Sequence, residues 1–406
     1  MNKLIAALAL LAACGPTRLQ PPHPVAIDAP PRVVGYLFAP AARAPGLIAS
    51  LPANAYTHID YAFANVSPEG AMILGNPCID VGACDSTAAL PDTLGGNFRA
   101  LAALKAAHPH LRLLVSVGGW GWSAHFSDAV LTDSSRRAFA SSGIELFLHR
   151  WPGLFDGFDI DWEFPVGGGM PTNIVRPEDR ANYTLMLAEL RRQLDEETQR
   201  TGRKYTLTVA LNAHAPRNDH VELDRITPLV DWINVMTYDF HDRGSPIANF
   251  NAPLHSPMGD VAPSYNVDSS ITMFLAAGVP PSKIVVGVPF YGRAFGGVAP
   301  ANDGLLQPTS GAPPADVVAG GMDYKSLVAK QLETKGFVRH WDAVAEVPWL
   351  YNRETGTWIT YDDPQSIAAK ADYARRNALG GVMIWQIAGD DSGRLATVIA
   401  RRIFMR

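Results

Sequence analysis

The feature that most constrains the fold is a series of eight short apolar runs, separated by segments with helical spacing. The runs are rich in valine, isoleucine and aromatic residues, and most are too apolar for strands with one face in water. They are therefore predicted to be buried parallel strands, at residues 33–38, 57–65, 112–117, 157–163, 205–211, 232–238, 284–289 and 381–386. Eight β–α units favour an α/β fold of the closed (β/α)8 TIM barrel type, although the sequence alone leaves an open, doubly wound sheet as the alternative.

The connection between the seventh and eighth strands is too long for a single helix. Residues 296–358 contain a predicted helix at 323–335, which Gly336 ends, and a predicted hairpin formed by 347–351 and 357–361. We therefore expect a small α+β insertion domain within a barrel domain of residues 32–406. In a barrel, this insertion would rise above the C-terminal face, where active sites lie, and would form one wall of a groove.

The N-terminus has the pattern of an export signal. Lys3 precedes an apolar run at residues 4–13, which is too short to span a bilayer but fits a signal peptide. The run ends in Leu-Ala-Ala-Cys, and this resembles the bacterial lipobox, in which the cysteine, here Cys14, is lipidated. Residues 1–13 are therefore predicted to be a lipoprotein-type signal peptide, with an ordinary cleaved signal as the alternative. The prolines of residues 14–31 indicate a stiff tether, and we expect a lipoprotein of the periplasm, the outer membrane or the cell surface.

Composition limits the expected partners. The 406 residues carry a net charge of −5 and no basic run, which argues against nucleic acid, and the only membrane contact we expect is the lipid at Cys14. Cys78 and Cys84 lie in a loop rich in turn-forming residues and are predicted to form a disulfide in an oxidising compartment. Metal binding is the alternative for these two cysteines, but there are only two thiols and no nearby histidine. We predict no cofactor and no metal, and we expect a monomer.

The most informative segment is 155–165, FDGFDIDWEFP, in which four acids interrupt an otherwise apolar strand. A buried strand normally excludes charge, so the acids need a chemical reason. Because side chains alternate between faces, Asp159, Asp161 and Glu163 point the same way, whereas Asp156 is out of phase near the start of the strand. The row is predicted to climb the barrel interior and to end with Glu163 at the C-terminal mouth.

This row of acids predicts acid–base chemistry. Asp159 and Asp161 cannot both ionise easily in a poorly solvated interior, so we expect them to share a proton. Neighbouring carboxylates favour the protonated form of Glu163, which suits a general acid near neutral pH. The alternatives are a salt-bridge network, for which the strand holds no basic partner, and a metal site, although three acids along one strand do not surround an ion.

Several motifs together resemble glycoside hydrolase family 18, the chitinase family. The segment FDGFDIDWEFP fits the DxxDxDxE signature of that family, SVGGW at 116–120 resembles its SxGG motif, and MTYD at 236–239 resembles its strand-six motif. The run YGR at 291–293 follows the seventh strand, as in chitinases with an insertion domain. Trp385 falls where the family keeps the tryptophan at the floor of its −1 subsite. The resemblance covers residues 32–406, and each motif lies at the C-terminal end of a predicted strand.

The resemblance implies hydrolysis of β-1,4 bonds between N-acetylglucosamine units, in chitin or its oligosaccharides, by a retaining, substrate-assisted mechanism. Glu163 would protonate the glycosidic oxygen and later act as the base for water. The acetamido oxygen of the substrate would attack the anomeric carbon and form an oxazolinium ion. Asp161 would orient the acetamido nitrogen, Asp159 would hold or exchange a proton with Asp161, and Tyr238 would bind the acetamido oxygen.

The resemblance also implies a set of residues that bind the sugar or support the acids. Ser116 and Tyr36 would satisfy Asp159 from below. The sugar itself would contact a larger group of side chains, namely Phe63, Trp120, Met236, Asp239, Tyr291, Arg293 and Trp385. Core packing is the alternative role for Tyr36, Phe63, Met236 and Trp385. Trp120 and Trp122 would stack on sugars at minus subsites, unless one of them belongs to the core.

Two other functions stay open at this point. The first is an endo-β-N-acetylglucosaminidase acting on glycoprotein glycans, which the insertion domain argues against. The second is a non-catalytic chitin lectin, but such relatives typically lose the acid and Glu163 is present. The sequence also departs from the family pattern MTYDFHGxW, because Gly244 stands where the tryptophan is expected. A shift of register in that loop would instead bring another aromatic residue, such as Phe250, to the same place.

Overall fold

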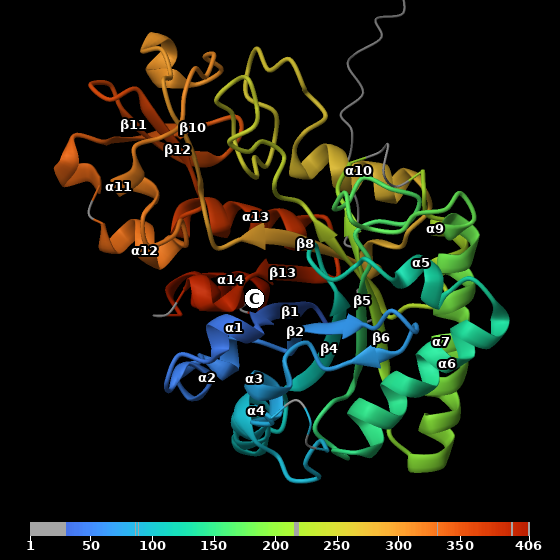
Figure 1. The fold of residues 1–406 in the computed structure, drawn as a ribbon. Helices are drawn as coiled ribbons and strands as arrows, with labels where there is room; N and C mark the ends of the chain where they lie inside the picture. Colours follow the sequence, from blue (N-terminus) through green and yellow to red (C-terminus); the bar gives the residue numbers. More distant parts are fainter. Residues whose placement is uncertain are drawn as a thin grey trace, which may run out of the picture.

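In the computed structural model of the chain, the described residues are 30–85, 87, 89–214, 219–330, 332–390 and 393–404. Eight parallel strands form a sheet that closes on itself, because β1 pairs with both β13 and β2 (Figure 1). Around the barrel they are β1 Arg32–Phe38, β2 His58–Val66, β4 Arg112–Gly118, β5 Gly157–Asp161, β6 Thr206–Asn212, β7 Trp232–Met236, β8 Ile284–Pro289 and β13 Gly381–Trp385. Each predicted strand lies within two residues of an observed one. The predicted barrel is therefore confirmed, and the open sheet is excluded.

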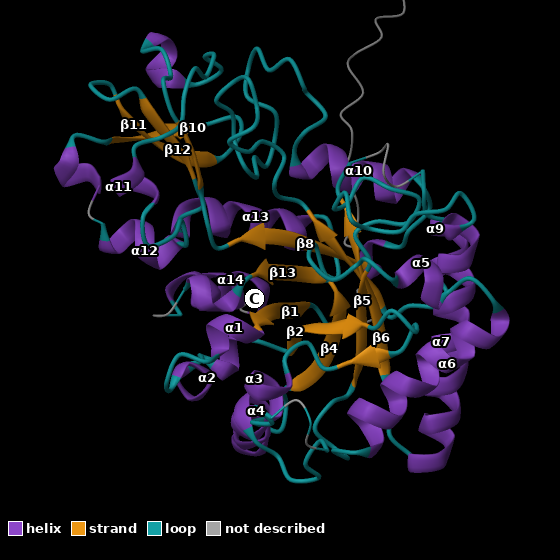
Figure 2. Ribbon diagram, viewed as in Figure 1, coloured by secondary structure: helices purple, strands orange, loops and turns teal. Residues whose placement is uncertain are grey.

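Helices and loops cover the outside of the barrel (Figure 2). The longest helix, α7 Asp179–Thr201, ends at Gly202, whose φ of 71° lies in the left-handed region that glycine tolerates. Helix α13 Pro364–Arg376 begins as predicted, because the carboxylate of Asp363 accepts hydrogen bonds from the backbone N–H groups of Gln365 and Ser366. The other elements here are α1 Ala39–Ala42, α2 Leu47–Ser50, β3 Met72–Ile73, α3 Pro77–Val81, α4 Gly96–Ala107, α5 Phe126–Ala129, α6 Asp133–Gly143, α9 Leu223–Ile226, α10 Val267–Ala276 and α14 Arg394–Phe404.

The insertion between β8 and β13 is a small antiparallel sheet with short helices. Its strands lie in the order β10 Val338–Asp342, β11 Val347–Asn352, β12 Thr357–Thr360 and β9 Arg293–Phe295. The predicted hairpin corresponds to β11 and β12, and the sheet extends slightly beyond the predicted limits of 296 and 358. The predicted helix at 323–335 is instead α12 Tyr324–Ala329 followed by a separate 3-10 turn at Leu332–Lys335. A further short helix is α11 Ala315–Val318.

A second hydrophobic core ties the insertion to the loop that follows β7. Ala248 and Phe250 of this loop pack with Phe295, Trp349 and other buried side chains of the insertion. Figure 1 shows this yellow loop beside the orange insertion and above the barrel. The loop after β7 and the insertion therefore form one packed unit at the C-terminal end of the strands.

Two sequence predictions concern the cysteines. Cys78 and Cys84 form the predicted disulfide, which joins α3 to the loop that follows it. The predicted signal peptide, Cys14 and most of the proline-rich tether lie outside the described residues. Within the described ranges, no helix combines the length and the apolar composition needed to cross a bilayer.

Candidate active site

Strand β5 carries the row of acids into the barrel. Asp159 is fully buried and Asp161 is 4% exposed, whereas Glu163 follows the strand and is only partly buried. The register of β5 explains this arrangement, since Asp159 lies opposite Ser116 of β4 and Thr208 of β6, in the barrel interior. The row therefore runs from the barrel interior to the mouth, with Glu163 as its outermost member.

Four side chains from four strands donate hydrogen bonds to the carboxylate of Asp159. The hydroxyl groups of Tyr36 and Ser116 lie 2.7 and 2.8 Å from Oδ2. On Oδ1, the hydroxyl of Thr208 lies at 2.6 Å and the amide of Asn234 at 3.3 Å. The structure thus brings Tyr36 and Ser116 to Asp159, and it adds Thr208 and Asn234, which sequence reasoning missed. The signal was present, because both are polar residues inside otherwise apolar strands.

Burial and mutual repulsion shape the titration of the two aspartates. Burial raises the pKa of Asp159, and the hydrogen bonds from Thr208, Tyr36, Ser116 and Asn234 offset part of that rise. Burial also raises the pKa of Asp161 well above its ordinary value, and the charges of Glu163 and Asp159 add to the effect. The Oδ1 atom of Asp161 has no hydrogen-bond partner among the described residues. The donors therefore stabilise a negative charge on Asp159, while Asp161 favours its protonated form.

The backbone of Glu163 is held in place on both sides. Its N–H group donates to the hydroxyl of Ser123 at 2.9 Å, and its carbonyl accepts from the side-chain amide of Asn173 at 2.8 Å. Ser123 in turn donates to the carbonyl of Gly119, within the SVGGW segment after β4. The loops after β4 and β5 therefore fix the position from which Glu163 extends into the mouth.

A pocket of about 460 Å³ opens above the acids. Its floor includes Trp385, whose ring stacks on Phe63 with centroids 5.6 Å apart and an interplanar angle of 25°. Tyr36 and Phe38 contact the same indole with centroids 5.7 and 6.2 Å away. The lining also includes further residues from the ends of several strands, namely Trp120, Trp122, Asp161, Glu163, Asn212, His214, Met236, Tyr238 and Asp239. An aromatic floor beside carboxylates suits the apolar face and polar edge of a sugar ring.

Asp239 gathers Tyr291 and Arg293 at one side of the pocket. The hydroxyl of Tyr291 donates to Oδ1 of Asp239 at 2.8 Å, and the guanidinium of Arg293 donates to the same oxygen at 3.0 and 2.5 Å. The guanidinium carbon also lies 4.9 Å from the centre of the Tyr291 ring. These three residues, predicted from two separate motifs, thus form one cluster that joins the end of β7 to the start of the insertion sheet.

The remaining predicted residues also reach the mouth. Tyr238 and Met236 line the pocket, and the Tyr238 hydroxyl lies 3.9 Å from the sulfur of Met383. Trp120 is 49% exposed, and Trp122 packs against Phe63 with ring centroids 6.5 Å apart. Neither tryptophan is buried in the core, so both rings are available at the pocket wall.

A larger cavity of about 1110 Å³ adjoins this pocket on the side of the insertion. The two cavities share Phe38 and Trp385 in their linings. Arg243 and Gly244 of the loop after β7 line the larger cavity, together with Arg293 and other residues of the insertion. The open space therefore continues from the acids past Trp385 and along the insertion, as a groove for an extended ligand would.

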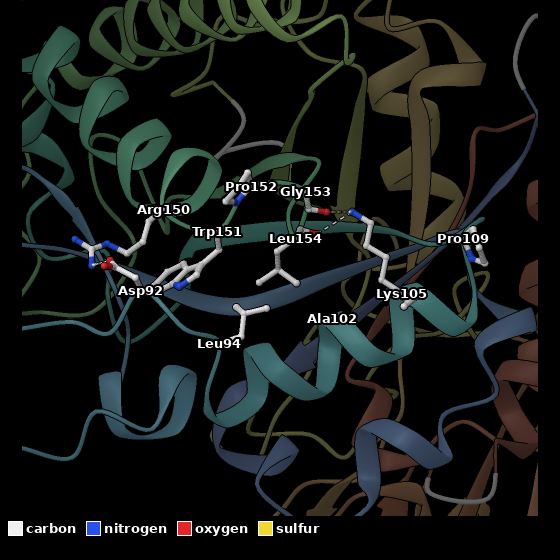
Figure 3. A pocket seen from close by; sticks show the side chains of 11 residues that line it. Asp92, Leu94, Ala102, Lys105, Pro109, Arg150, Trp151, Pro152, Gly153 and Leu154 are labelled. Carbon is white, nitrogen blue, oxygen red and sulfur yellow. Dashed lines mark hydrogen bonds and ion pairs between the residues drawn. The ribbon is translucent and has the colours of Figure 1, made fainter.

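Another cavity, of about 570 Å³, lies outside the barrel between α4 and residues 150–154 (Figure 3). One of its charged side chains, Lys105, donates to the carbonyls of Gly153 and Leu154 and pairs with Asp156 at 2.6 Å. Arg203 also pairs with Asp156, at 3.0 Å. Asp156, the acid of segment 155–165 that is out of phase with the other three, is therefore part of a salt-bridge network. The expectation that such a network lacked partners was wrong for Asp156, because its cations come from α4 and from the loop before β6.

Within the described ranges, no group of three or more His, Cys, Asp or Glu side chains is arranged to hold a metal ion.

The chain as a whole is similar to known proteins in both sequence and structure. The model of "Glycosyl hydrolases family 18" matches residues 32–390. Chitinase A1 of Niallia circulans is 37% identical, over 92% of this chain and 58% of that protein, so the chain spans little more than half the length of this relative. Among solved structures, chitinase ChiA74 from Bacillus thuringiensis has a TM-score of 0.81 at 35% identity, covering 89% of this chain and 66% of the other. An N-acetylglucosaminidase from Paenibacillus barengoltzii has a TM-score of 0.78 at 32% identity, covering 92% and 99%.

Proposed function

Because this chain belongs to glycosyl hydrolases family 18, we propose that it hydrolyses β-1,4 bonds between N-acetylglucosamine units of chitin or its oligosaccharides. The observation that carries the proposal is the row of Asp159, Asp161 and Glu163, which ends in a pocket floored by Trp385. The relatives named chitinase support the same activity.

The proposed mechanism begins with Glu163 as the general acid. Its proton passes to the glycosidic oxygen as the bond from that oxygen to the anomeric carbon breaks. The acetamido oxygen of the same sugar attacks the anomeric carbon and closes an oxazolinium ring. Water then attacks that carbon, Glu163 takes the proton from water, and the ring reopens, so the configuration is retained.

The other acids stabilise this pathway. Asp161 accepts a hydrogen bond from the acetamido nitrogen and balances the positive charge of the oxazolinium ion, for which it must be ionised. Its proton then moves to Asp159, where a hydroxyl group such as that of Ser116 turns to accept the hydrogen bond of the protonated carboxyl. Tyr238 holds the acetamido oxygen for in-line attack, while the Asp239, Tyr291 and Arg293 cluster and Trp385 position the sugar.

Two measurements test the proposal. Mass spectrometry of the products from chitin hexamer is expected to give shorter N-acetylglucosamine oligosaccharides, and their sizes distinguish endo from exo cleavage. NMR during early turnover of chitotetraose is expected to show the β-anomer first. An initial α-anomer, or cleavage of fully deacetylated chitosan, would overturn the substrate-assisted mechanism, because both reactions dispense with the acetamido nucleophile.

The rival functions predict other outcomes. An endo-β-N-acetylglucosaminidase would release glycans from glycoproteins and leave chitin hexamer intact. A lectin would bind the hexamer and release no product. The carboxyl of Glu163 at the pocket favours a hydrolase over a lectin, and the groove along the insertion favours a linear substrate over a branched glycan.

We further propose that the protein is exported and anchored by a lipid at Cys14. The support is the apolar run at residues 4–13 followed by cysteine and by a proline-rich segment. Such an anchor would hold the barrel near the cell surface, where soluble chitin oligosaccharides pass.

A further inference from the structure

The barrel interior holds a third buried carboxyl besides Asp159 and Asp161. Asp60 lies in β2, fully buried, between Ile59 and Tyr61, which point outward into the core between barrel and helices. Neither oxygen of Asp60 has a hydrogen-bond partner of ordinary geometry among the described residues. A buried carboxyl without donors lowers the stability of the fold, so its presence beside the catalytic acids indicates a functional role.

The strands around Asp60 show which groups it faces. The register pairs it with Tyr36 on β1 and with Leu114 on β4. Across the barrel it interacts electrostatically with Asp159 and Asp161 of β5, and the nearby amide is that of Asn234 on β7. The titratable groups that face Asp60 are therefore Tyr36, Asp159 and Asp161, and none of them is a cation.

These surroundings set the order in which the three aspartates lose protons. Burial raises the pKa of Asp60 well above its ordinary value, the charge of Asp159 raises it further, and the Asn234 amide opposes the shift. Asp159 has four donors to stabilise its anion, whereas Asp60 has no donor of ordinary geometry among the described residues. Asp159 therefore ionises first, and Asp60 keeps its proton to higher pH.

We propose that Asp60 is a positioning residue, the innermost member of a column of three carboxyls that also includes Asp159 and Asp161. Asp60 keeps one proton on the Asp159 and Asp161 pair up to the alkaline end of the pH range in which the enzyme works. When Asp60 finally ionises, its negative charge opposes the loss of the remaining proton from the acids above it. The column with Asp60 thus retains its last proton to higher pH than a column without it. This inference rests on the proposed function, because it concerns the same reaction.

The kinetic test compares Asp60→Asn with the natural protein in kcat/KM against pH, using chitotetraose. We expect the alkaline limb of the Asp60→Asn profile to move to lower pH by about one unit, the size of coupling typical of interacting carboxyls. Asp80→Asn is the matched control. Asp80 is also buried, and burial raises its pKa to about 6, but it binds the hydroxyl of Tyr61 on the outer face of β2. Its substitution is expected to leave the limb in place.

A second test needs no substrate. Since the folded-state pKa of Asp60 is raised above its unfolded value, its contribution to stability is present below about pH 3.9 and is lost as pH rises toward the folded pKa. The Tm of Asp60→Asn minus that of the natural protein is therefore expected to increase with pH. If Asp60→Asn does not fold, Asp60→Ser replaces it in both tests, with the same expectations.

The outcomes separate this inference from the proposed function. A natural protein that leaves chitotetraose intact contradicts the proposed function, and the Tm series still reports the titration of Asp60. A natural protein that cleaves chitotetraose with an alkaline limb identical to that of Asp60→Asn overturns the role given to Asp60. A Tm difference that is constant with pH also overturns it.

Discussion

The hydroxyl of Thr208 lies 2.6 Å from Oδ1 of Asp159 and makes the shortest of the four side-chain hydrogen bonds to that carboxylate. Thr208→Val keeps the shape of the side chain but removes this donor, so the anion of Asp159 is less stable and its pKa rises. In the proposed mechanism the proton of Asp161 moves to Asp159, and a raised pKa of Asp159 favours that transfer. We therefore expect kcat/KM on chitotetraose to rise, by about tenfold at most, since a hydrogen bond to a charged group contributes about 1.5–3 kcal/mol and three donors remain. Thr206→Val is the control, because the Thr206 hydroxyl makes no hydrogen bond to Asp159. Equal activity of the two variants would contradict this role.

Glu163→Gln is expected to abolish turnover and to leave oligosaccharide binding measurable. The amide keeps the shape of the side chain but cannot deliver a proton to the leaving oxygen. Turnover is measured with chitotetraose, and binding by calorimetry. Glu354→Gln, at the exposed turn between β11 and β12, controls for the loss of a carboxylate elsewhere. If Glu163→Gln kept a tenth of the natural kcat, Glu163 would not be the acid.

Gly244→Trp is expected to increase transglycosylation. Phe250 is fully buried in the core that joins the loop to the insertion, so it does not replace the tryptophan that the family keeps near Gly244. A Cβ at Gly244 would meet only the Asp242 side chain, at 3.1 Å, so a side chain can begin there with a small shift of Asp242. A ring there would hold a sugar acceptor more tightly by about 1 kcal/mol, as aromatic contacts do.

The measurement is the yield of products longer than the substrate at high chitotetraose concentration, with Gly244→Ala as the control for losing glycine. We expect few such products from the natural protein. Abundant longer products from the natural protein would show that its acceptor side already binds a sugar tightly.

His149 is expected to make stability depend on pH. Its Nδ1 lies 2.8 Å from Glu145 and its Nε2 lies 3.1 Å from Glu197 of α7. Partial burial lowers its pKa, but the hydrogen bonds to both glutamates outweigh burial, and the net shift is upward. A raised pKa means that the stabilisation is fully present below about pH 6.5 and is lost as pH rises through the folded pKa.

His149→Gln is therefore expected to lower the Tm at pH 5.5 and to leave it unchanged at pH 9. The difference corresponds to less than about 1 kcal/mol, since exposed ion pairs contribute little. His108→Gln is the control, because His108 forms no ion pair with the described residues. A deficit of the same size at both pH values would assign His149 a packing role instead.

Cys14→Ser is expected to release the protein from membranes or to block its processing. Palmitate labelling in a Gram-negative host, followed by separation of membrane and soluble fractions, measures this. A soluble, unlabelled natural protein that begins at Cys14 would indicate an ordinary cleaved signal.

The strands and the catalytic row were predictable because their signals are local. Each strand is a short apolar run, and alternation along β5 places Asp159, Asp161 and Glu163 on one face. The hydrogen bonds of Asp159 from Thr208 and Asn234 were not predictable in this way. They depend on the register between β5, β6 and β7, which no single segment determines.

The roles of Asp60 and Asp156 also depend on residues far away in the sequence, so neither role was predictable from the local pattern. Asp60 is one acid in an apolar strand, but nothing near it in the sequence shows that it faces Asp159. Asp156 lies in the most informative segment, yet Lys105 and Arg203, far away in the sequence, make it a structural residue. The helix predicted at 323–335 is divided into two turns, because the small insertion provides only short surfaces for helices to cover.

The closure of the barrel determines when the fold can be completed during synthesis. Arg32 of β1 pairs with Gly381 of β13, so all the strands between them must leave the ribosome before β1 and β13 can meet. Until then, the partly made sheet has two open edges and an exposed interior. A nascent chain in this state exposes apolar surface to which chaperones bind. The topology thus delays closure of the barrel until both β1 and β13 have been synthesised.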